Sequence, residues 1–569
     1  MASLNSTPTS ASPGIHHDPN ENTSATTFVK DEKTELQLAK TSTMVASEST
    51  ILTGRKLVLV YIAMLLSLMV VALDSTILAT PLPRIASDFD AFNLQGWVAT
   101  AFVLAQTIFI LFYGQLLRIF PPKWILVACI AIFEVGSLAC ALAQNINTMI
   151  AGRAVTGLGA AGIWVAILQI IAQISHLENR AILLGGFQFV FGFASVAGPL
   201  VGGAFTDDVT WRWCFYINLP IGGASVLAIV LFLKASPPLG SDLNKRTRRH
   251  LLQQTLSLDL GGVVLVAGFV TSLVLALQWG GNTKPWGDKD VVICFVLAGV
   301  TVVALIFWER YQGEHAMIPL AIFRSKSIYA LVMYCGLNQV ALLLFSYYIP
   351  IFYQAARHST ATHSGIDTLP FLLSVILSVV AGSLYVSKSG RYWPILVVSP
   401  IFLALGSGLL YSLQPDTKLS NVIGYQILAG IGTGLGIQNP FIALQVEFQY
   451  TPDLLGQAMS MGSFWQVLGG TVGLGMAEPI FASQLSKHLK LYAPTAPASV
   501  VTQSPTAIYS TLSPFLIPGV VHSYTEALKA VFLVGVPVAI LALLASFLVN
   551  NIKILKSLET EPEKVIMRA

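Results

Sequence analysis

Stretches of about 20 mostly apolar residues recur along the chain after its first fifty residues, and short polar or charged segments separate them. An α-helix of about this length crosses the roughly 30 Å hydrocarbon core of a bilayer with its backbone hydrogen bonds satisfied internally. Only 11% of the 569 residues are charged, whereas soluble domains carry about 25%. The sequence therefore predicts an all-α, polytopic integral membrane protein.

The apolar stretches divide the chain into about fourteen predicted spans. They lie near 57–80, 95–117, 124–143, 146–171, 181–204, 215–234, 258–278, 290–308, 327–352, 365–387, 393–413, 420–444, 456–481 and 527–549. The predicted parts are a disordered cytoplasmic tail (1–54), an N-terminal six-helix bundle (55–235), a basic cytoplasmic loop with two inserted helices (236–325), a C-terminal six-helix bundle (326–550) with an outside loop (482–525), and a second cytoplasmic tail (551–569). The first tail is assigned because its polar composition cannot bury a core.

Lysine and arginine are unevenly distributed between the two sides of the predicted membrane. With a cytoplasmic N-terminus, more than half of the 32 lysines and arginines fall on cytoplasmic segments, as the positive-inside rule requires. We therefore expect a multi-pass protein of the cell membrane with both termini in the cytosol; the vacuolar membrane is the alternative. The run "KRTRRH" (245–250) is either a solvated loop that sets this orientation or a contact site for anionic lipids.

Residue patterns typical of enzymes, metal sites and nucleic-acid sites are missing from the sequence. The five cysteines are scattered, mostly inside apolar stretches where a free thiol acts as a small hydrophobe, and the nine histidines lack metal-ligand spacing. There is no P-loop and no nucleophile elbow. A net charge of +4 is too small to indicate nucleic-acid binding. We expect no catalytic residues, metal or cofactor, and an ion gradient as the energy source for any pumping.

Two pairs of segments indicate an internal repeat. "GQLLRIFPPKW" (114–124) follows the second span and "GSLYVSKSGRY" (382–392) follows the tenth. "GLGAAGIWVAILQ" (157–169) in the fourth span is similar to "GIGTGLGIQNPFIALQ" (430–445) in the twelfth. Spans one to six thus correspond to spans nine to fourteen, with two helices inserted between. Parallel six-helix halves around a midplane cavity are a recurring transporter architecture.

Four motifs together carry a resemblance to a known family. They are "ALDSTILATPLPRI" (72–85), "AGRAVTGLG" (151–159), "GPLVGG" (198–203) and "WRWCFYINLPIG" (211–222). In this order and on these spans they resemble the fourteen-span drug:proton antiporter branch of the major facilitator superfamily, most closely its fungal toxin-efflux type. The resemblance covers roughly residues 55–550 and implies the major facilitator fold.

The fifth predicted span contains a proline among small residues. Proline kinks a helix, and small residues allow neighbouring helices to approach closely. The pattern resembles the family's antiporter motif, which occurs in exporters more than in importers, although Ala194 replaces a usual glycine; close packing alone is the alternative explanation. The residues concerned are Gly185, Gly198, Pro199, Gly202 and Gly203.

Two further family segments carry weaker implications. In "WRWCFYINLPIG" we expect the four aromatic side chains, beside Arg212 and Asn218, to form an interfacial belt that anchors the sixth span. The loop after the second span has Arg118 and Pro121 where the superfamily usually has an acid and a glycine, leaving Gly114 and Lys123. The resemblance therefore does not support the family's cytoplasmic latch in the first half, while Gly390 and Arg391 are candidates for a version of it in the second.

Asp74 is the one carboxylate after about eighteen uncharged residues of the first span. At about 1.5 Å per residue from Lys56 it lies about 27 Å along its helix, in the outer half of the membrane. It either lies at the interface, bonded to Thr76 or nearby backbone, or faces the cavity and carries the coupling proton, because burial disfavours a charged carboxylate. The first-span acid of the family has a similar role.

Other charged residues within spans are further candidates for proton coupling. Arg153 needs an acid, a carbonyl or water as a partner; similar arginines of the family are implicated in proton coupling, and a purely structural contact between helices is the alternative. Glu134 is the second candidate, and Glu447 and Glu478 are further acids within or near apolar stretches.

Uncharged polar and aromatic residues inside the spans are the candidates for cargo contacts, because such groups turn away from lipid; contacts between helices are the alternative for each of them. They are Gln106, Trp164, Gln169, Gln188, Asn338, Gln438, Asn439, Gln445 and Gln466. We expect a monomeric proton-coupled secondary transporter in the lipid bilayer that exports a bulky amphiphilic small molecule. The alternatives are a siderophore or vacuolar amino-acid permease of the same superfamily and a transporter-like sensor.

Overall fold

The computed structural model describes residues 51–78, 80–91, 94–241, 247–281, 284–497, 501, 508–509 and 512–554. The two predicted tails, and the start of the "KRTRRH" run, lie largely outside these ranges. In the described part, thirteen helices are long and apolar enough to cross a membrane. The remaining predicted span, 456–481, lies within a longer helix, α18 (Leu455–Tyr492), whose many glycine and polar residues lower its mean hydropathy.

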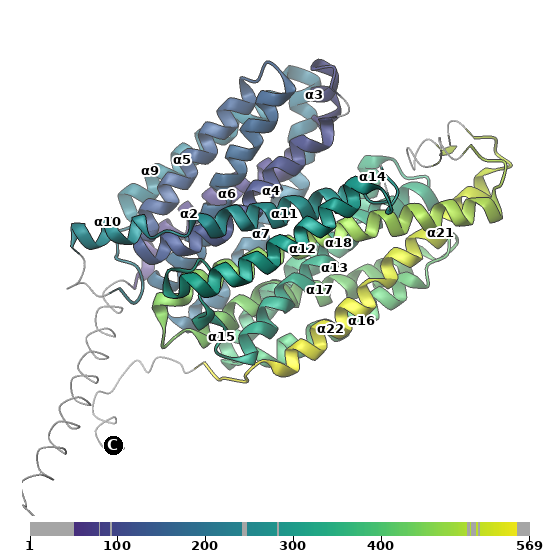
Figure 1. Cartoon of the computed structure of the whole chain (residues 1–569). Helices are drawn as coiled ribbons and strands as arrows, with labels where there is room; N and C mark the ends of the chain where they lie inside the picture. Colours follow the sequence, from purple (N-terminus) through teal and green to yellow (C-terminus); the bar gives the residue numbers. More distant parts are fainter. Residues whose placement is uncertain are drawn as a thin grey trace, which may run out of the picture. The chain divides into compact units, whose positions relative to one another are not determined.

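The helices of the two predicted bundles follow in chain order (Figure 1). The first half contains α2 (Gly54–Ile77), α3 (Leu82–Asp88), α4 (Gln95–Ile119), α5 (Pro122–Ala141), α6 (Ile146–Ile174), α7 (Leu177–Ala204), the π-helical η2 (Phe205–Val209), α8 (Trp213–Tyr216) and α9 (Asn218–Phe232). The inserted part contains α10 (Arg248–Leu256), α11 (Leu260–Trp279) and α12 (Lys289–Gln312). The second half contains α13 (Lys326–Ala356), α14 (Ala361–Asp367), α15 (Leu369–Ser389), α16 (Trp393–Tyr411), α17 (Leu419–Glu447), α18, α21 (Ile517–Leu533) and α22 (Gly535–Leu548).

Helix also occupies both ends of the predicted outside loop 482–525. α18 continues to Tyr492 and α21 begins at Ile517. The segment from Ser483 to Lys490 mixes apolar and polar residues without a proline or glycine, so the helix continues beyond the apolar stretch that marked the predicted span. The loop is therefore shorter than predicted.

The two halves share one pattern of helix pairing. In the first half α2 packs on α7 and α9, α5 packs on α6 and α9, and α4 packs on α6. In the second half α13 packs on α18 and α22, α16 packs on α17 and α22, and α15 packs on α17. Each helix pair of the first half corresponds to the pair of the second half whose helices hold the same places in span order, as expected for an internal repeat.

Glycines allow the closest of these helix pairs to form. A Cβ at Gly159 of α6 would lie 2.6 Å from the backbone nitrogen of Phe133 on α5. On the corresponding pair, a Cβ at Gly432 of α17 would lie 2.3 Å from the backbone nitrogen of Leu403 on α16. Any larger residue would push these helices apart.

Different loops mark the two ends of the bundle. The inner end is defined by residues 118–123 between α4 and α5, and is the end predicted to be cytoplasmic; the outer end is defined by residues 205–212. The halves meet where α7 packs on α15 and α4 packs on α18. The inserted pair α11 and α12 packs together, and α11 also contacts α4 and α18.

Candidate functional site

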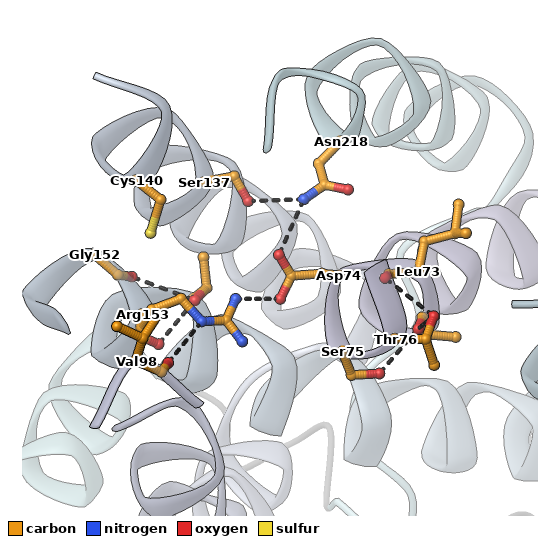
Figure 2. Close-up of polar contacts among 12 residues, drawn as sticks. Leu73, Asp74, Ser75, Thr76, Val98, Ser137, Cys140, Gly152, Arg153 and Asn218 are labelled. Atoms are coloured by element: carbon orange, nitrogen blue, oxygen red, sulfur yellow. Dashed lines mark hydrogen bonds and ion pairs between the residues drawn. The ribbon is translucent and has the colours of Figure 1, made fainter. Parts of the chain in front are cut away.

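Asp74 and Arg153 form a buried ion pair between α2 and α6 (Figure 2). Nη1 of Arg153 lies 2.5 Å from Oδ2 of Asp74, and the two side chains are 2% and 0% exposed. The Arg153 Nε also donates to the Val98 carbonyl of α4 at 3.1 Å, and its guanidinium lies 4.5 Å from the Phe102 ring centroid. The acid partner that Arg153 needs is thus Asp74, on a helix about eighty residues earlier in the chain.

Asn218 completes the site from α9. Its Nδ2 donates to Oδ1 of Asp74 at 3.3 Å and to Oγ of Ser137, on α5, at 3.2 Å (Figure 2). Asn218 is fully buried. Helices α2, α5, α6 and α9 therefore each contribute a polar side chain to one cluster. Asn218 is not among the site residues predicted from the sequence, although an amide among the apolar residues of α9 is a usable signal.

The predicted antiporter motif on α7 brings that helix close to α2 beside this cluster. A Cβ at Gly198 would lie 2.2 Å from Oγ1 of Thr76, and one at Gly202 would lie 2.6 Å from the carbonyl oxygen of Ile77. Thr76 itself donates to the Ala194 carbonyl of α7 at 2.8 Å. Thr76 therefore ties α2 to α7, whereas Asp74 turns to Arg153 and Asn218.

The other residues of the motif differ in their surroundings. A Cβ at Gly185 would lie 2.9 Å from Oγ of Ser383 on α15, so this glycine lies where the two halves meet. Pro199 lies inside α7 and removes a backbone donor there. A Cβ at Gly203 would have no atom within 4 Å. Close packing thus explains Gly185, Gly198 and Gly202 but not Gly203.

The aromatic motif after α7 is only partly an interfacial belt. Trp211 and Phe215 are 2% and 0% exposed, and the Trp211 indole donates to Oδ2 of Asp88 at 2.9 Å. Trp213 is 47% exposed. The belt prediction is therefore wrong for two of the four rings, because they fill a packed core in which the indole N–H finds a carboxylate.

Glu134 does not pair with Arg153, whose guanidinium is turned to Asp74. The carboxylate of Glu134 instead faces α9 at Gly222, where a Cβ would lie 1.8 Å from its Oε1. Glu447 accepts a hydrogen bond from Asn550 at 2.9 Å near the inner end. The candidates Asp74 and Arg153 are thus brought together, and Glu134 lies separately from them.

Four of the nine predicted cargo residues have buried amide atoms without a hydrogen-bond partner in the described part of the chain. Both amide atoms of Gln438 are in this state, as are Oε1 of Gln169, Oδ1 of Asn439 and Nε2 of Gln445. Gln169 lies on α6, and the other three lie on the corresponding helix α17. Buried amides without partners are rare and costly, so these positions are suited to binding water or a ligand.

The remaining predicted cargo residues make contacts or are half-buried. Asn338 donates to the Thr433 carbonyl at 3.0 Å, and Trp164 donates to Oγ of Ser463 at 3.1 Å. The Trp164 ring also lies 6.0 Å from the Phe187 ring and 5.9 Å from the Phe191 ring. The half-buried residues are Gln106, Gln188 and Gln466.

Contacts between the halves close the inner end in this conformation. Arg180 at the start of α7 donates to Oε1 of Gln445 on α17 at 3.3 Å, and also to the Ala172 carbonyl at 2.7 Å. A Cβ at Gly114 of α4 would lie 2.0 Å from Oγ of Ser460 on α18. We call the contacts of α4, α6 and α7 with α15, α17 and α18 at this end the inner seam.

Residues 313–318, which leave the inserted helix pair, bind both sides of the inner seam. Gln115 of α4 donates to the His315 carbonyl at 2.8 Å. Gln457 of α18 donates to the Ala316 and Met317 carbonyls at 3.2 and 3.3 Å. The buried Asp259 anchors the segment, since its Oδ2 accepts from the Met317 backbone nitrogen at 3.4 Å. We call residues 313–318 the strap.

The two loops in which the family usually places its latch contact different segments here. In the first half, Nζ of Lys123 donates to the Val230 and Leu233 carbonyls at the end of α9, at 3.0 and 2.5 Å, and Arg118 donates to the strap at Glu314. In the second half, Gly390 has φ +68° and its carbonyl accepts from Ile554 at 2.8 Å. In the first half, Lys123 and Arg118 thus bind backbone carbonyls in these contacts.

The described residues hold no group of three or more His, Cys, Asp or Glu placed to bind a metal. All five cysteines are free.

The family model described as Major Facilitator Superfamily matches residues 64–474. The chain is 39% identical to the MFS-type transporter phomT of Diaporthe leptostromiformis, over 77% of this chain and 73% of that one. It is 36% identical to the MFS-type efflux pump MFS1 of Trichophyton rubrum (87% and 91% covered). It is 34% identical to the efflux pump aflT of Aspergillus parasiticus (87% and 95% covered).

Solved structures share the fold at low sequence identity. The human organic anion transporter MFSD10 (TETRAN) matches with a TM-score of 0.56 at 14% identity, covering 88% of this chain and 100% of that one. The proton:xylose symporter XylE matches with a TM-score of 0.53 at 13% identity, covering 85% and 94%. At these identities the likeness concerns the fold alone.

Proposed function

Because the chain belongs to the major facilitator superfamily, we propose that it is a proton-coupled secondary transporter that exports a bulky amphiphilic secondary metabolite, toxin or drug by alternating access. The protein is a membrane transporter and not an enzyme. Export is supported by relatives named as efflux pumps and by the antiporter pattern around Gly198 and Pro199.

The buried pair of Asp74 and Arg153 is the observation that carries proton coupling. When Asp74 is ionised, the pair joins α2 to α6 and Asn218 joins it to α9. A proton on Asp74 removes the negative charge, so that Arg153 keeps only the Val98 carbonyl and the Phe102 ring as described partners. Proton binding therefore favours a conformation in which these helices are less tightly joined, because a ligand shifts an equilibrium by its differential affinity for the two states.

The cargo is proposed to bind amides, with few fixed charges nearby. The unpartnered atoms of Gln438, Asn439 and Gln169 are buried where hydrogen bonds to a ligand would offset their desolvation. Amides with neighbouring rings such as Trp164 suit a large, mostly neutral molecule that has both apolar surface and hydrogen-bonding groups.

We propose further that the protein acts as a monomer in the cell membrane with both termini in the cytosol, so that the inner end is the cytoplasmic end. The charge distribution along the sequence supports this orientation. If the inner end faces the cytosol, the closed inner seam corresponds to the conformation that releases cargo to the outside.

Asp74→Asn tests the coupling proposal. The cargo is first identified by comparing metabolites retained in cells with and without the protein, and the purified variants are then assayed in liposomes for export driven by a pH gradient. We expect Asp74→Asn to lose gradient-driven export while retaining exchange without a gradient, and Asp74→Glu to keep part of the activity because a carboxylate remains.

Asp290→Asn is the matched control, because Asp290 is a partly exposed acid that pairs with Lys284 at the outer end. It is expected to transport like the wild type. Wild-type export rate and pH dependence in Asp74→Asn would show that Asp74 does not carry the coupling proton.

A further inference from the structure

The carboxylate of Glu134 is buried between α5 and α9 without a hydrogen-bond partner among the described residues. Both of its oxygens are in this state. Gly222 of α9 provides the space for it, since a Cβ there would lie 1.8 Å from Oε1 and 2.7 Å from the carboxyl carbon. Gly222 therefore leaves room for the carboxyl group of Glu134, but no described residue donates a hydrogen bond to it.

The charged and titratable groups on the neighbouring helices do not compensate an anion at this position. Helix α9 carries none over Asn218–Phe232, and α8 carries only Cys214 and Tyr216. Helix α6 carries only Arg153, whose guanidinium is bonded to Asp74 of α2. A carboxylate that lacks both a cation and donors is unstable as an anion away from water, so it takes up a proton and becomes neutral.

Glu134 lies about one helical turn from the Asp74 cluster, on its inner side. Ser137 follows Glu134 by three residues on α5, and Gly222 follows Asn218 by four on α9. Asn218 joins Ser137 to Asp74 through its amide nitrogen. Two carboxyl groups thus lie about one helical turn apart in the first half; one is ion-paired and the other has no hydrogen-bond partner among the described residues.

We propose that Glu134 is a second proton-binding site, protonated in this conformation, through which the transporter carries a further proton per cycle. The proposal rests on the proton coupling proposed for Asp74. In the step it adds, the O–H bond of the Glu134 carboxyl breaks and the proton leaves to water at the inner end once the inner seam opens. After the inner seam closes, the carboxylate takes up a proton that enters from water at the outer end, so the O–H bond forms again, one proton has crossed per cycle, and no other reactant is needed.

Infrared spectra and proton counting on the purified protein test this without any cargo. We expect the wild type minus Glu134→Gln difference spectrum to contain the carbonyl stretch of a protonated carboxylic acid, which decreases as the pH is raised from about 5 to about 9. Potentiometric titration over the same range should show one proton fewer bound per chain in Glu134→Gln. Glu447→Gln is the control, since Glu447 has a donor in Asn550 and is expected to leave the protonated-acid band unchanged.

Two results would overturn the proposal. Absence of the band in the wild type would mean that Glu134 is ionised, and a band that persists unchanged at every pH, with equal proton counts in both proteins, would mean that it is a fixed structural acid. Glu134→Asp provides a second variant with a carboxyl group if Glu134→Gln does not fold. Failure of coupling itself would appear separately, as unchanged export in Asp74→Asn.

Discussion

The two six-helix halves share one arrangement of helices but differ in the side chains that join them. In the first half, α2 and α6 are joined by the ion pair of Asp74 and Arg153. On the corresponding helices of the second half, Asn338 of α13 donates to the Thr433 carbonyl of α17. A neutral hydrogen bond therefore suffices to hold this helix pair, and the fold does not require the charges of the first half.

The neutral contacts of the second half continue on α16. Tyr334 donates to Oγ of Ser399 at 2.8 Å, and Ser399 donates to the Gly432 carbonyl at 2.8 Å. A buried ion pair contributes little net stability, because the desolvation of both ions offsets their attraction. Because the corresponding contact between α13 and α17 is neutral, stability does not explain the Asp74–Arg153 pair, which supports the coupling role proposed for it.

Arg153→Met should give the largest effect. It leaves the fully buried Asp74 without its cation, and breaking one partner of a buried pair costs about 3–5 kcal/mol of stability. Thermal unfolding in detergent should show this loss, and gradient-driven transport should be abolished.

The double variant Asp74→Asn/Arg153→Met sharpens this test. Because neither charge remains, the first half becomes neutral like the second, and we expect most of the stability to return without recovery of coupling. An additive loss in the double variant would contradict the idea that the unpaired charge causes the damage.

Asn218→Ala and Asn338→Ala form a matched pair with an intermediate effect. Asn218 donates to an ionised group, worth about 1.5–3 kcal/mol, and Asn338 donates to a neutral carbonyl, worth about 0.5–1.5 kcal/mol. Asn218→Ala should therefore lose more stability and also shift the pH dependence of transport. An equally large shift of the pH dependence of transport in Asn338→Ala would contradict the proposal that proton binding takes place in the first half.

Gln457→Leu should have the smallest effect. It removes the hydrogen bonds between α18 and the strap, and one such bond contributes about 1 kcal/mol, or about a fivefold change in an equilibrium. Spin labels on the inner ends of α4 and α18 should then show a larger population with the seam open. Gln484→Leu, on the outer part of α18, is the control and should leave the distance distribution unchanged. An unchanged distance distribution in Gln457→Leu would mean that the strap does not hold the halves together.

The sequence predicted more of the fold than of the site. The length of the apolar stretches predicts the spans. Each span must form its own backbone hydrogen bonds in lipid, so it is visible in the sequence as an apolar stretch of about 20 residues. The apolar stretch 456–481 also predicts α18, although the mean hydropathy of this helix falls below that of the others. The apolar stretch does not predict where α18 ends, since the helix continues past it to Tyr492.

Asp74 and Arg153 could be selected from the sequence because a charge inside an apolar stretch is costly and therefore conspicuous. Their pairing could not, since it depends on how α2 and α6 are rotated against each other. Uncharged residues give a weaker signal, because an amide or ring within a span is compatible with a contact to cargo, to another helix or to the interface. The sequence predicts an aromatic belt beside Asn218, whereas Trp211 and Phe215 of that belt are buried in the core.

The sequence by itself determined that this chain crosses a membrane many times, repeats a six-helix unit and keeps a few charges inside it, because these properties follow from composition and spacing along one dimension. The tertiary structure decided that Arg153 pairs with Asp74 rather than Glu134, that Gly222 makes room for an unpartnered carboxyl group, and that the strap joins Gln115 to Gln457. These contacts join residues from helices far apart in the chain, and only the rotation and register of packed helices bring such side chains within a few ångströms.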